Sequence, residues 1–189
     1  MWANGNRYKG KWKEGKLTGR PSLFHASGDR YRGGWKKGEP HGRGVSLGKK
    51  GSKYEGDWKD GKKHGRGVYV WVNSERYDGE FKDGKKHGRG VIKFANGNSY
   101  DGEWNDDKRS GHGIYQFATG NRYRGGWKDN VQYGRGVMMY RNGDSCEGDW
   151  RGKRLLGTGK GRVEGKSRYQ GRKVKCYWDG KKVIVTNKR

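Results

Sequence analysis

Three histidines, His41, His64 and His87, recur at intervals of 23 residues in this chain of 189 residues. Histidine can bind metals and transfer protons near neutral pH. A metal ion needs its ligands within about 2 Å of one point, but equivalent residues of stacked two-stranded units lie roughly 10 Å apart. The three side chains therefore cannot converge on one ion, and we expect each to pack or hydrogen-bond at a turn.

No other residues have the spacing of a catalytic constellation. A nucleophile, a base and an orienting group cannot be assigned together, and strings such as Gly42-Arg43-Gly44 recur along the chain without the helix that a phosphate-binding loop requires. The sequence therefore predicts a non-enzymatic protein with no catalytic, cofactor-binding or metal-binding residues, no cofactor and no small-molecule substrate.

Basic residues are the candidates for binding, because the chain carries a net charge of +25. Such a charge favours nucleic acid, anionic lipid headgroups or an acidic protein surface as partners. Many of the cations stand beside expected turns, without acidic partners in their own unit, where they would form a ridge along one edge. The candidate anion- or partner-binding residues are Lys13, Lys36, Lys59, Lys62, Lys63, Lys82, Lys85, Lys86, Lys108, Arg109, Lys128, Lys181 and Lys182. A single turn lysine also solubilises the chain and protects a sheet edge, so the binding hypothesis depends on the whole set.

A second column of cations is expected to be neutralised inside the sheet. Arg43, Arg66, Arg89 and Arg135 are spaced by multiples of 23 residues. In a two-stranded unit, Arg66 would face Glu55 or Asp57 on the neighbouring strand, and cross-strand pairs of opposite charge are favourable. We therefore expect polyanion binding to depend on the lysines more than on these arginines.

The positions of these residues follow from a 23-residue repeat. The first aromatic column consists of Tyr8, Tyr31, Tyr54, Tyr77, Tyr100 and Tyr123, is continued by Cys146, and ends at Tyr169. Two places after each member stands a glycine. Four places after each member from Tyr8 to Cys146 stands Trp or, once, Phe81. A fixed period without insertions is typical of stacked identical units.

Alternation within the unit predicts strands. In Tyr54–Trp58 the rings and Gly56 point to one side and the two acids to the other. Asp60-Gly61 then predicts a tight turn, and Asn96-Gly97 a turn into the following unit. Glycines leave slots into which neighbouring rings can lie. The expected fold is all-β, an elongated single-sheet ribbon of stacked antiparallel hairpins with a core of rings on glycine slots.

This pattern resembles the MORN (membrane occupation and recognition nexus) repeat family, whose unit is similar to Y-x-G-x-W-x-x-G-x-x-H-G-x-G. The third unit here reads YEGDWKDGKKHGRGVYVWVNSER. We expect one repeat domain over residues 1–189, with a half unit at 1–7, seven full repeats at 8–168, and a degenerate repeat with a capping hairpin at 169–189.

The resemblance implies a structural or scaffold protein that binds other proteins, or a second copy of itself, along an extended basic surface. The alternative is a peripheral binder of polyanions, either anionic membrane lipid or the nucleic-acid backbone. Similar short MORN proteins occur in some large DNA viruses, so a virion component is a further setting for that alternative.

The cysteines and the distribution of apolar residues indicate where in the cell the protein would be found. Cys146 and Cys176 show no disulfide or zinc spacing, and Cys146 takes the tyrosine position of its column, so we expect a packed thiol. There is no apolar leader and no run long enough to span a membrane. The expectation is an intracellular protein, soluble or peripheral to a membrane.

Overall fold

Strands account for every regular element in the residues that the structure, a computed structural model, describes. These residues are 5–14, 16–163, 172–178 and 183–186, and for some strand residues near the two ends only the backbone is described. The chain divides into two units, Met1–Ala95 and Asn96–Arg189.

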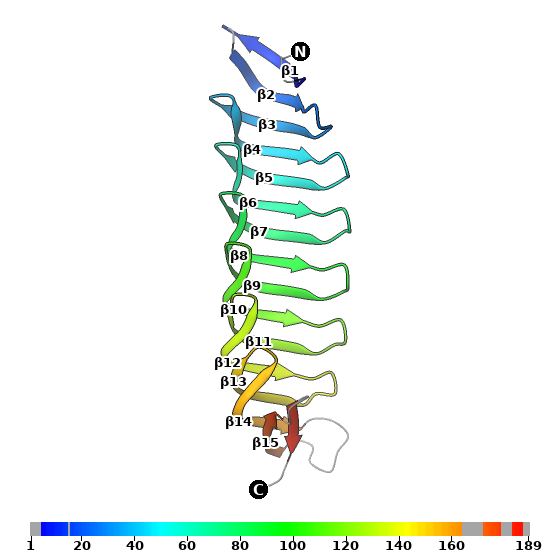
Figure 1. Ribbon diagram of the computed structural model, residues 1–189, viewed down its shortest axis with the longest axis vertical. Coiled ribbons are helices and arrows are strands. Elements are labelled where there is room, and N and C mark those ends of the chain that lie inside the picture. The colour runs from blue at the N-terminus through cyan, green and yellow to red at the C-terminus, as the bar shows by residue number, and fades with distance from the viewer. Residues whose placement is uncertain (1–4, 15, 164–171, 179–182, 187–189) are drawn as a thin grey trace. The chain divides into compact units, whose positions relative to one another are not determined.

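The first unit is a single antiparallel layer in which each strand pairs with the next one along the chain (Figure 1). Its strands are β1 (Arg7–Lys13), β2 (Lys16–Phe24), β3 (Arg30–Lys36), β4 (Glu39–Leu47), β5 (Lys53–Lys59), β6 (Lys62–Val70), β7 (Arg76–Lys82) and β8 (Lys85–Lys93).

The second unit repeats this plan, again with antiparallel pairing in chain order. Its strands are β9 (Ser99–Asn105), β10 (Lys108–Gln116), β11 (Arg122–Lys128), β12 (Val131–Met139), β13 (Ser145–Arg151), β14 (Arg154–Val163), β15 (Arg172–Trp178) and β16 (Val183–Thr186). The predicted all-β class built from stacked hairpins is confirmed. The final hairpin also forms, although its Asp179-Gly180 turn lies outside the described residues.

Two kinds of connection alternate along the chain. Asp60-Gly61 joins β5 to β6 with φ values of 45° and 75°, the combination that a two-residue type I′ hairpin turn requires. The longer connection after β6 is closed by the backbone N–H of Trp71 donating to Glu75 and that of Ser74 donating to Trp71. The Asp-Gly turn predicted from the sequence is therefore confirmed.

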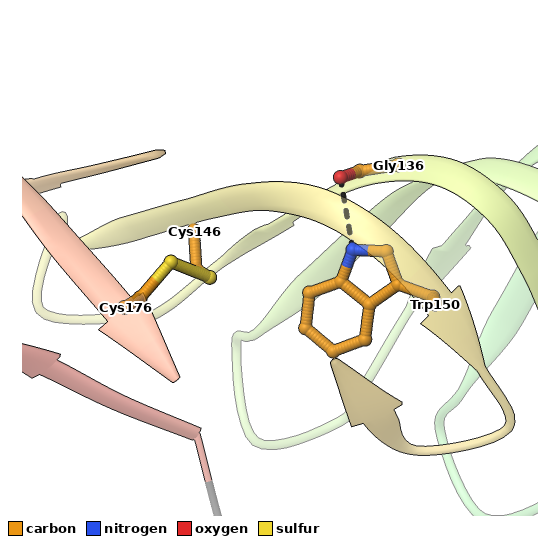
Figure 2. Close-up of a disulfide and its surroundings, with 4 residues drawn as sticks. All are labelled: Gly136, Cys146, Trp150 and Cys176. Carbon is orange, nitrogen blue, oxygen red and sulfur yellow. Dashed lines mark hydrogen bonds between the residues drawn. A yellow bond between two sulfur atoms is a disulfide. The ribbon is translucent and has the colours of Figure 1, made fainter. Parts of the chain in front are cut away.

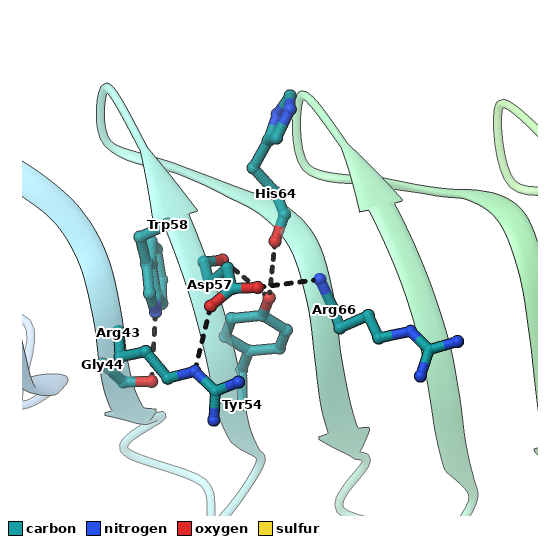
Figure 3. A network of polar contacts seen from close by, with 7 residues as sticks. All are labelled: Arg43, Gly44, Tyr54, Asp57, Trp58, His64 and Arg66. Carbon is teal, nitrogen blue, oxygen red and sulfur yellow. Dashed lines mark hydrogen bonds and ion pairs between the residues drawn. The ribbon is translucent and has the colours of Figure 1, made fainter.

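A bulge explains the first glycine of the Gly-x-Gly string. Gly56 pairs with Gly67, but the next residue, Asp57, pairs with His64, so β6 carries two extra residues at this point. Gly65 in the bulge has a φ of +55°, which side-chain-bearing residues rarely adopt. The Asp57 carboxylate closes the bulge by accepting the backbone N–H of Arg66 at 3.1 Å (Figure 3).

The core is a ladder of rings lying on glycines. Tyr54 is fully buried, and its ring meets Trp58 and Phe81 edge to face at centroid distances of 5.2 and 5.1 Å. Its hydroxyl donates to the carbonyl of Asp57 at 2.8 Å (Figure 3). A Cβ on Gly67 would lie 2.5 Å from the Tyr54 ring. The predicted arrangement of rings on glycine slots is therefore confirmed.

The second unit carries the same ladder. Tyr123 contacts Trp127 and Trp150 at 5.4 and 5.7 Å. The indole N–H of Trp150 donates to the carbonyl of Gly136 at 2.9 Å (Figure 2). This bond recurs in the first unit between Trp58 and Gly44, which shows that it belongs to the repeat.

The expected packed thiol at Cys146 is wrong, because Cys146 and Cys176 form a disulfide (Figure 2). Both residues are fully buried. Cys146 on β13 pairs with Gly161, and Cys176 on β15 pairs with Gly159, so the bridge links the two strands that flank β14. The cysteines are 30 residues apart in sequence, and only the strand order brings them together.

Candidate partner-binding surfaces

A groove of about 650 Å³ crosses the strands of the first unit, on the sheet face opposite the tyrosine ladder. Its centre is one cross-strand row of five residues. The row consists of Arg32, Val45, Glu55, Val68 and Asp78. Glycines of the neighbouring row, which bear no side chains, complete the floor. The groove therefore combines a low, partly apolar floor with charged walls.

The acids of the groove are already paired with cations. Glu55 accepts from Lys53 at 2.7 Å, and this hydrogen bond, with the lysine's charge, lowers the pKa of the Glu55 carboxyl. Asp78 pairs with Arg76 at 2.8 Å. The charges of Glu55 and Asp78 are therefore balanced by cations of their own strands.

Four arginines line the groove, and they differ in their partners. Arg43 forms an ion pair with Asp57 at 3.2 Å (Figure 3). Arg20, Arg32 and Arg66 have no carboxylate within ion-pair distance among the described residues. Three cations are therefore available to a ligand in this groove.

The prediction that the Arg43 column is neutralised holds for only part of that column. Arg43 is paired, and Arg135 lies 3.5 Å from Glu147. The bulge takes Arg66 out of the register opposite Asp57 of β5. On its other side, Arg66 lies opposite Glu80 of β7. Its contact with Asp57 runs through its backbone N–H, and its guanidinium remains exposed. Arg89 repeats this backbone contact with Glu80 at 3.0 Å.

The lysines next to the two-residue turns fall into two groups, exposed and half-buried, because successive residues of a strand point to opposite faces. Those that end a strand or begin the next one are exposed, and these are Lys36, Lys59, Lys62, Lys82, Lys85, Lys108 and Lys128. Lys108 forms an ion pair with Asp129 at 2.9 Å, and Lys128 lies over the ring of Tyr133. We call Lys36, Lys59, Lys62 and Lys82 the lysine ridge.

The second cation of each pair does not belong to that ridge. Lys63 lies 4.3 Å above the ring centroid of Tyr69, Lys86 lies 5.6 Å above Trp71, and Arg109 lies 4.6 Å above Trp127. All three are half-buried. The expectation that they are unpaired edge charges is wrong, because alternation turns them onto the ring face, where cation–π contact holds them.

Three of the candidate cations cannot be placed. The side chain of Lys13, at the end of β1, is outside the described part of the structure. Lys181 and Lys182 lie outside it entirely. Their binding role stays a prediction.

The histidine column lies beside the turn of the following hairpin. Nδ1 of His41 is 3.4 Å from a carboxylate oxygen of Asp60, and Nδ1 of His64 is 3.8 Å from Asp83. This agrees with the expected turn contacts. Among the described residues, no three His, Cys, Asp or Glu side chains converge as a metal site. The described chain also contains no helix long and apolar enough to cross a membrane.

Among solved structures, the TCP domain of Drosophila melanogaster SAS-4 (dCPAP), determined in complex with a proline-rich motif of Ana2 (dSTIL), has a similar fold. Its TM-score is 0.51 at 11% identity, covering 83% of each chain. The wild-type TCP10 domain of Danio rerio CPAP matches with a TM-score of 0.36 at 17% identity, covering 99% of this chain and 98% of that one. No curated protein sequence matched the chain.

The MORN repeat model matches residues 8–20, 31–53, 54–76, 77–99, 100–122 and 123–145. These matches cover more than half of the sequence and coincide with the hairpin period that the strands show. The chain therefore belongs to the MORN repeat family.

Proposed function

We propose that this protein is a non-enzymatic scaffold that binds other proteins along the charged face of its sheet. The observation that carries the proposal is the groove of the first unit, where Arg20, Arg32 and Arg66 stand without carboxylate partners among the described residues. Arginine donates paired hydrogen bonds to carboxylates, and these charge-assisted bonds are stronger than neutral ones. An acidic protein segment is the ligand that such walls favour.

The dimensions of the groove suit an extended segment. Arg32 is on β3 and Arg66 is on β6. Neighbouring strands are about 4.8 Å apart, so three strand spacings give roughly 14 Å, which about five residues of extended chain would cover. Val45 and Val68 between the charges offer apolar contact to side chains that alternate with the acids.

Two features favour a protein segment over a nucleic-acid backbone in this groove. Glu55 and Asp78 interrupt the row of arginines, so the groove offers no continuous line of cations to a row of phosphates, whereas a peptide offers N–H donors as well as carboxylates. The SAS-4 TCP domain was solved in complex with a proline-rich motif, which supports the idea that a sheet of this fold can present a peptide site. This support rests on the similarity between the two folds and not on shared binding residues.

A photo-crosslinking residue at Val68 tests the proposal in native extract. We expect it to capture a protein partner, and we expect a variant that also carries Arg32→Glu and Arg66→Glu to lose that partner. The matched control carries Lys59→Glu and Lys62→Glu, which change the charge equally outside the groove and should leave capture intact. Equal capture by the groove variant and the control would rule the groove out as the binding surface.

The second candidate function is polyanion binding, which the exposed lysine ridge and the net charge of +25 favour. Its ligand would be an anionic membrane surface or the nucleic-acid backbone. Nuclease treatment of the extract separates the two functions, because partners held through nucleic acid are lost and protein partners survive.

We also propose an intracellular setting, in solution, at a membrane surface or in a virion, and association with a second copy. Cell fractionation tests the first of these proposals, and light scattering tests the second.

A further inference from the structure

A pocket of about 220 Å³ lies in the second unit, bounded by β10, β11, β12 and the turn after β13. Pockets that hold drug-sized ligands usually measure about 300–1,000 Å³. This pocket is therefore suited to a single amino-acid residue and not to a cofactor. It shares no residue with the groove of the first unit.

One wall of the pocket is aromatic. Tyr115 lies 4.7 Å from Phe117 and 5.9 Å from Trp127, measured between ring centroids. Val131 also lines the pocket and is 48% exposed, so an apolar residue is open to solvent there. This wall favours an aliphatic or aromatic side chain.

The pocket also contains a half-buried cation. The Arg109 guanidinium lies 5.2 Å above the ring centroid of Tyr115, and it donates to the backbone carbonyl of Asn130 at 2.8 Å. Burial lowers the pKa of Arg109. Among the described residues, no carboxylate lies within ion-pair distance of its five N–H donors. A half-buried cation without a counter-ion favours an anionic ligand.

Gln132 supplies a second polar group. It occupies the column position that Lys63, Lys86 and Arg109 hold in earlier repeats, and it is only 6% exposed while lining the pocket. Its side-chain amide has no hydrogen-bond partner in the described part of the chain. An amide that lines a pocket without a protein partner can donate to, or accept from, a polar ligand atom there.

We propose that this pocket binds the C-terminal residue of a partner chain when that residue is apolar, such as Leu or Phe. The α-carboxylate accepts from Arg109 and from the amide of Gln132, with the exposed Lys153 as a further cation of the lining. The side chain packs against the aromatic wall. A terminal residue is the occupant because it carries an anionic group and an apolar group within the volume of one residue.

Nucleobase stacking is a poor alternative here. Trp127 is only 7% exposed, and Arg109 lies over its ring. A base therefore has no free face of Trp127 on which to stack. A phosphate group, in turn, would leave the apolar wall unused.

Fluorescence polarisation with a labelled six-residue peptide that ends in Leu tests the proposal. The free acid should bind the full-length protein, and the same peptide with a C-terminal amide should bind at least about tenfold more weakly, because it cannot form the charge-assisted bonds. Equal binding of the two peptides, or no binding of the free acid by the folded protein at millimolar concentration, would overturn the proposal.

Three variants localise the site. Arg109→Gln should lose the preference for the free acid. Val131→Arg should abolish binding by filling the pocket although it adds a positive charge, and its exposed position keeps folding intact. The control Lys63→Gln removes an equivalent cation over rings in the first unit and should bind like the wild type. Unchanged binding by Val131→Arg would place the peptide elsewhere. The groove variant that carries Arg32→Glu and Arg66→Glu should bind this peptide like the wild type. The pocket proposal and the groove proposal can therefore fail independently of each other.

Discussion

At the scale of single residues, the glycines of the ring slots decide whether the repeat can pack. Gly67 lies beneath Tyr54, whose ring has no exposed surface and whose hydroxyl is already bonded to the Asp57 carbonyl. A side chain at this position would displace the ring from its neighbours Trp58 and Phe81. Interiors packed this closely do not accept added volume without strain.

Gly67→Val should therefore destabilise the protein by about 1–3 kcal/mol or more, the usual cost of overpacking. Chemical denaturation followed by tryptophan fluorescence measures the change. The control is Arg66→Val, which adds the same side chain at the neighbouring exposed position and should be close to neutral. Equal stability of the two variants would contradict the ring-slot packing.

The buried tyrosines predict a loss of stability in alkaline solution. Burial raises the pKa of Tyr31, Tyr123 and Tyr140 to about 12, while unfolded tyrosine titrates near 10. Between these values the folded state binds more protons than the unfolded state, so stability is fully present below about pH 10 and falls as the pH rises toward 12. Denaturation at a series of pH values, with phenolate absorbance recorded in parallel, checks this. Ionisation of all the tyrosines near pH 10 without loss of structure would contradict it.

At the scale of elements, the disulfide takes over a position that a ring fills elsewhere. Cys146 continues the tyrosine column, and Cys176 comes from the atypical last hairpin, where its sulfur would lie 2.9 Å from a Cβ on Gly159. The bridge thus fills the slot and ties β15 to β13 across β14. The bridge therefore attaches the hairpin of β15 and β16 covalently to the regular repeats.

Replacing both cysteines by serine should destabilise the second unit by about 2–4 kcal/mol, the typical contribution of a disulfide. Limited proteolysis should cut β15 before the other strands of that unit in this variant. Because both cysteines are fully buried, reductant should release thiols from the wild type only when denaturant is added. Free thiols in the native, untreated protein would contradict the bridge.

At the scale of the whole molecule, the dominant property is the excess of 45 basic over 20 acidic residues. The structure separates the exposed lysine ridge from Lys63, Lys86 and Arg109, which are held over rings. Charge reversal at the ridge therefore tests polyanion binding without disturbing the core.

Lys59→Glu with Lys62→Glu should weaken binding to duplex DNA and to anionic vesicles at about 50 mM salt, where screening is weak. For DNA, the slope of log affinity against log salt should become shallower by about 0.9 for each lost phosphate contact. The control reverses Lys49 and Lys50, two exposed lysines in a longer connection. Equal effects of the two variants would show attraction to net charge without a ridge, and the protein-scaffold function would then stand alone.

The sequence by itself determined the repeat, the strands, the tight turns and the ring slots. These features depend on local rules: the alternation in Tyr54–Trp58 fixes a strand with two faces, and Asp60-Gly61 fixes a turn that accepts positive φ. Because every unit repeats these signals, a strand or turn that is unclear in one repeat can be assigned from the equivalent residues of the next. The resemblance to the family rests on the same pattern.

Only the tertiary structure decided which charges are available and which cysteines are joined. The two-residue bulge at Gly65 and Arg66 shifts the register after Gly56, so Arg66 does not lie opposite Asp57 of its own hairpin, and among the described residues its guanidinium has no carboxylate within ion-pair distance. Alternation along β6 puts Lys62 and Lys63 on opposite faces, and the rings that hold Lys63 come from three different strands. The pairing of Cys146 with Cys176 depends on both strands packing beside β14. Each of these outcomes is set by contacts between strands, and a spacing along the chain does not encode the register that creates them.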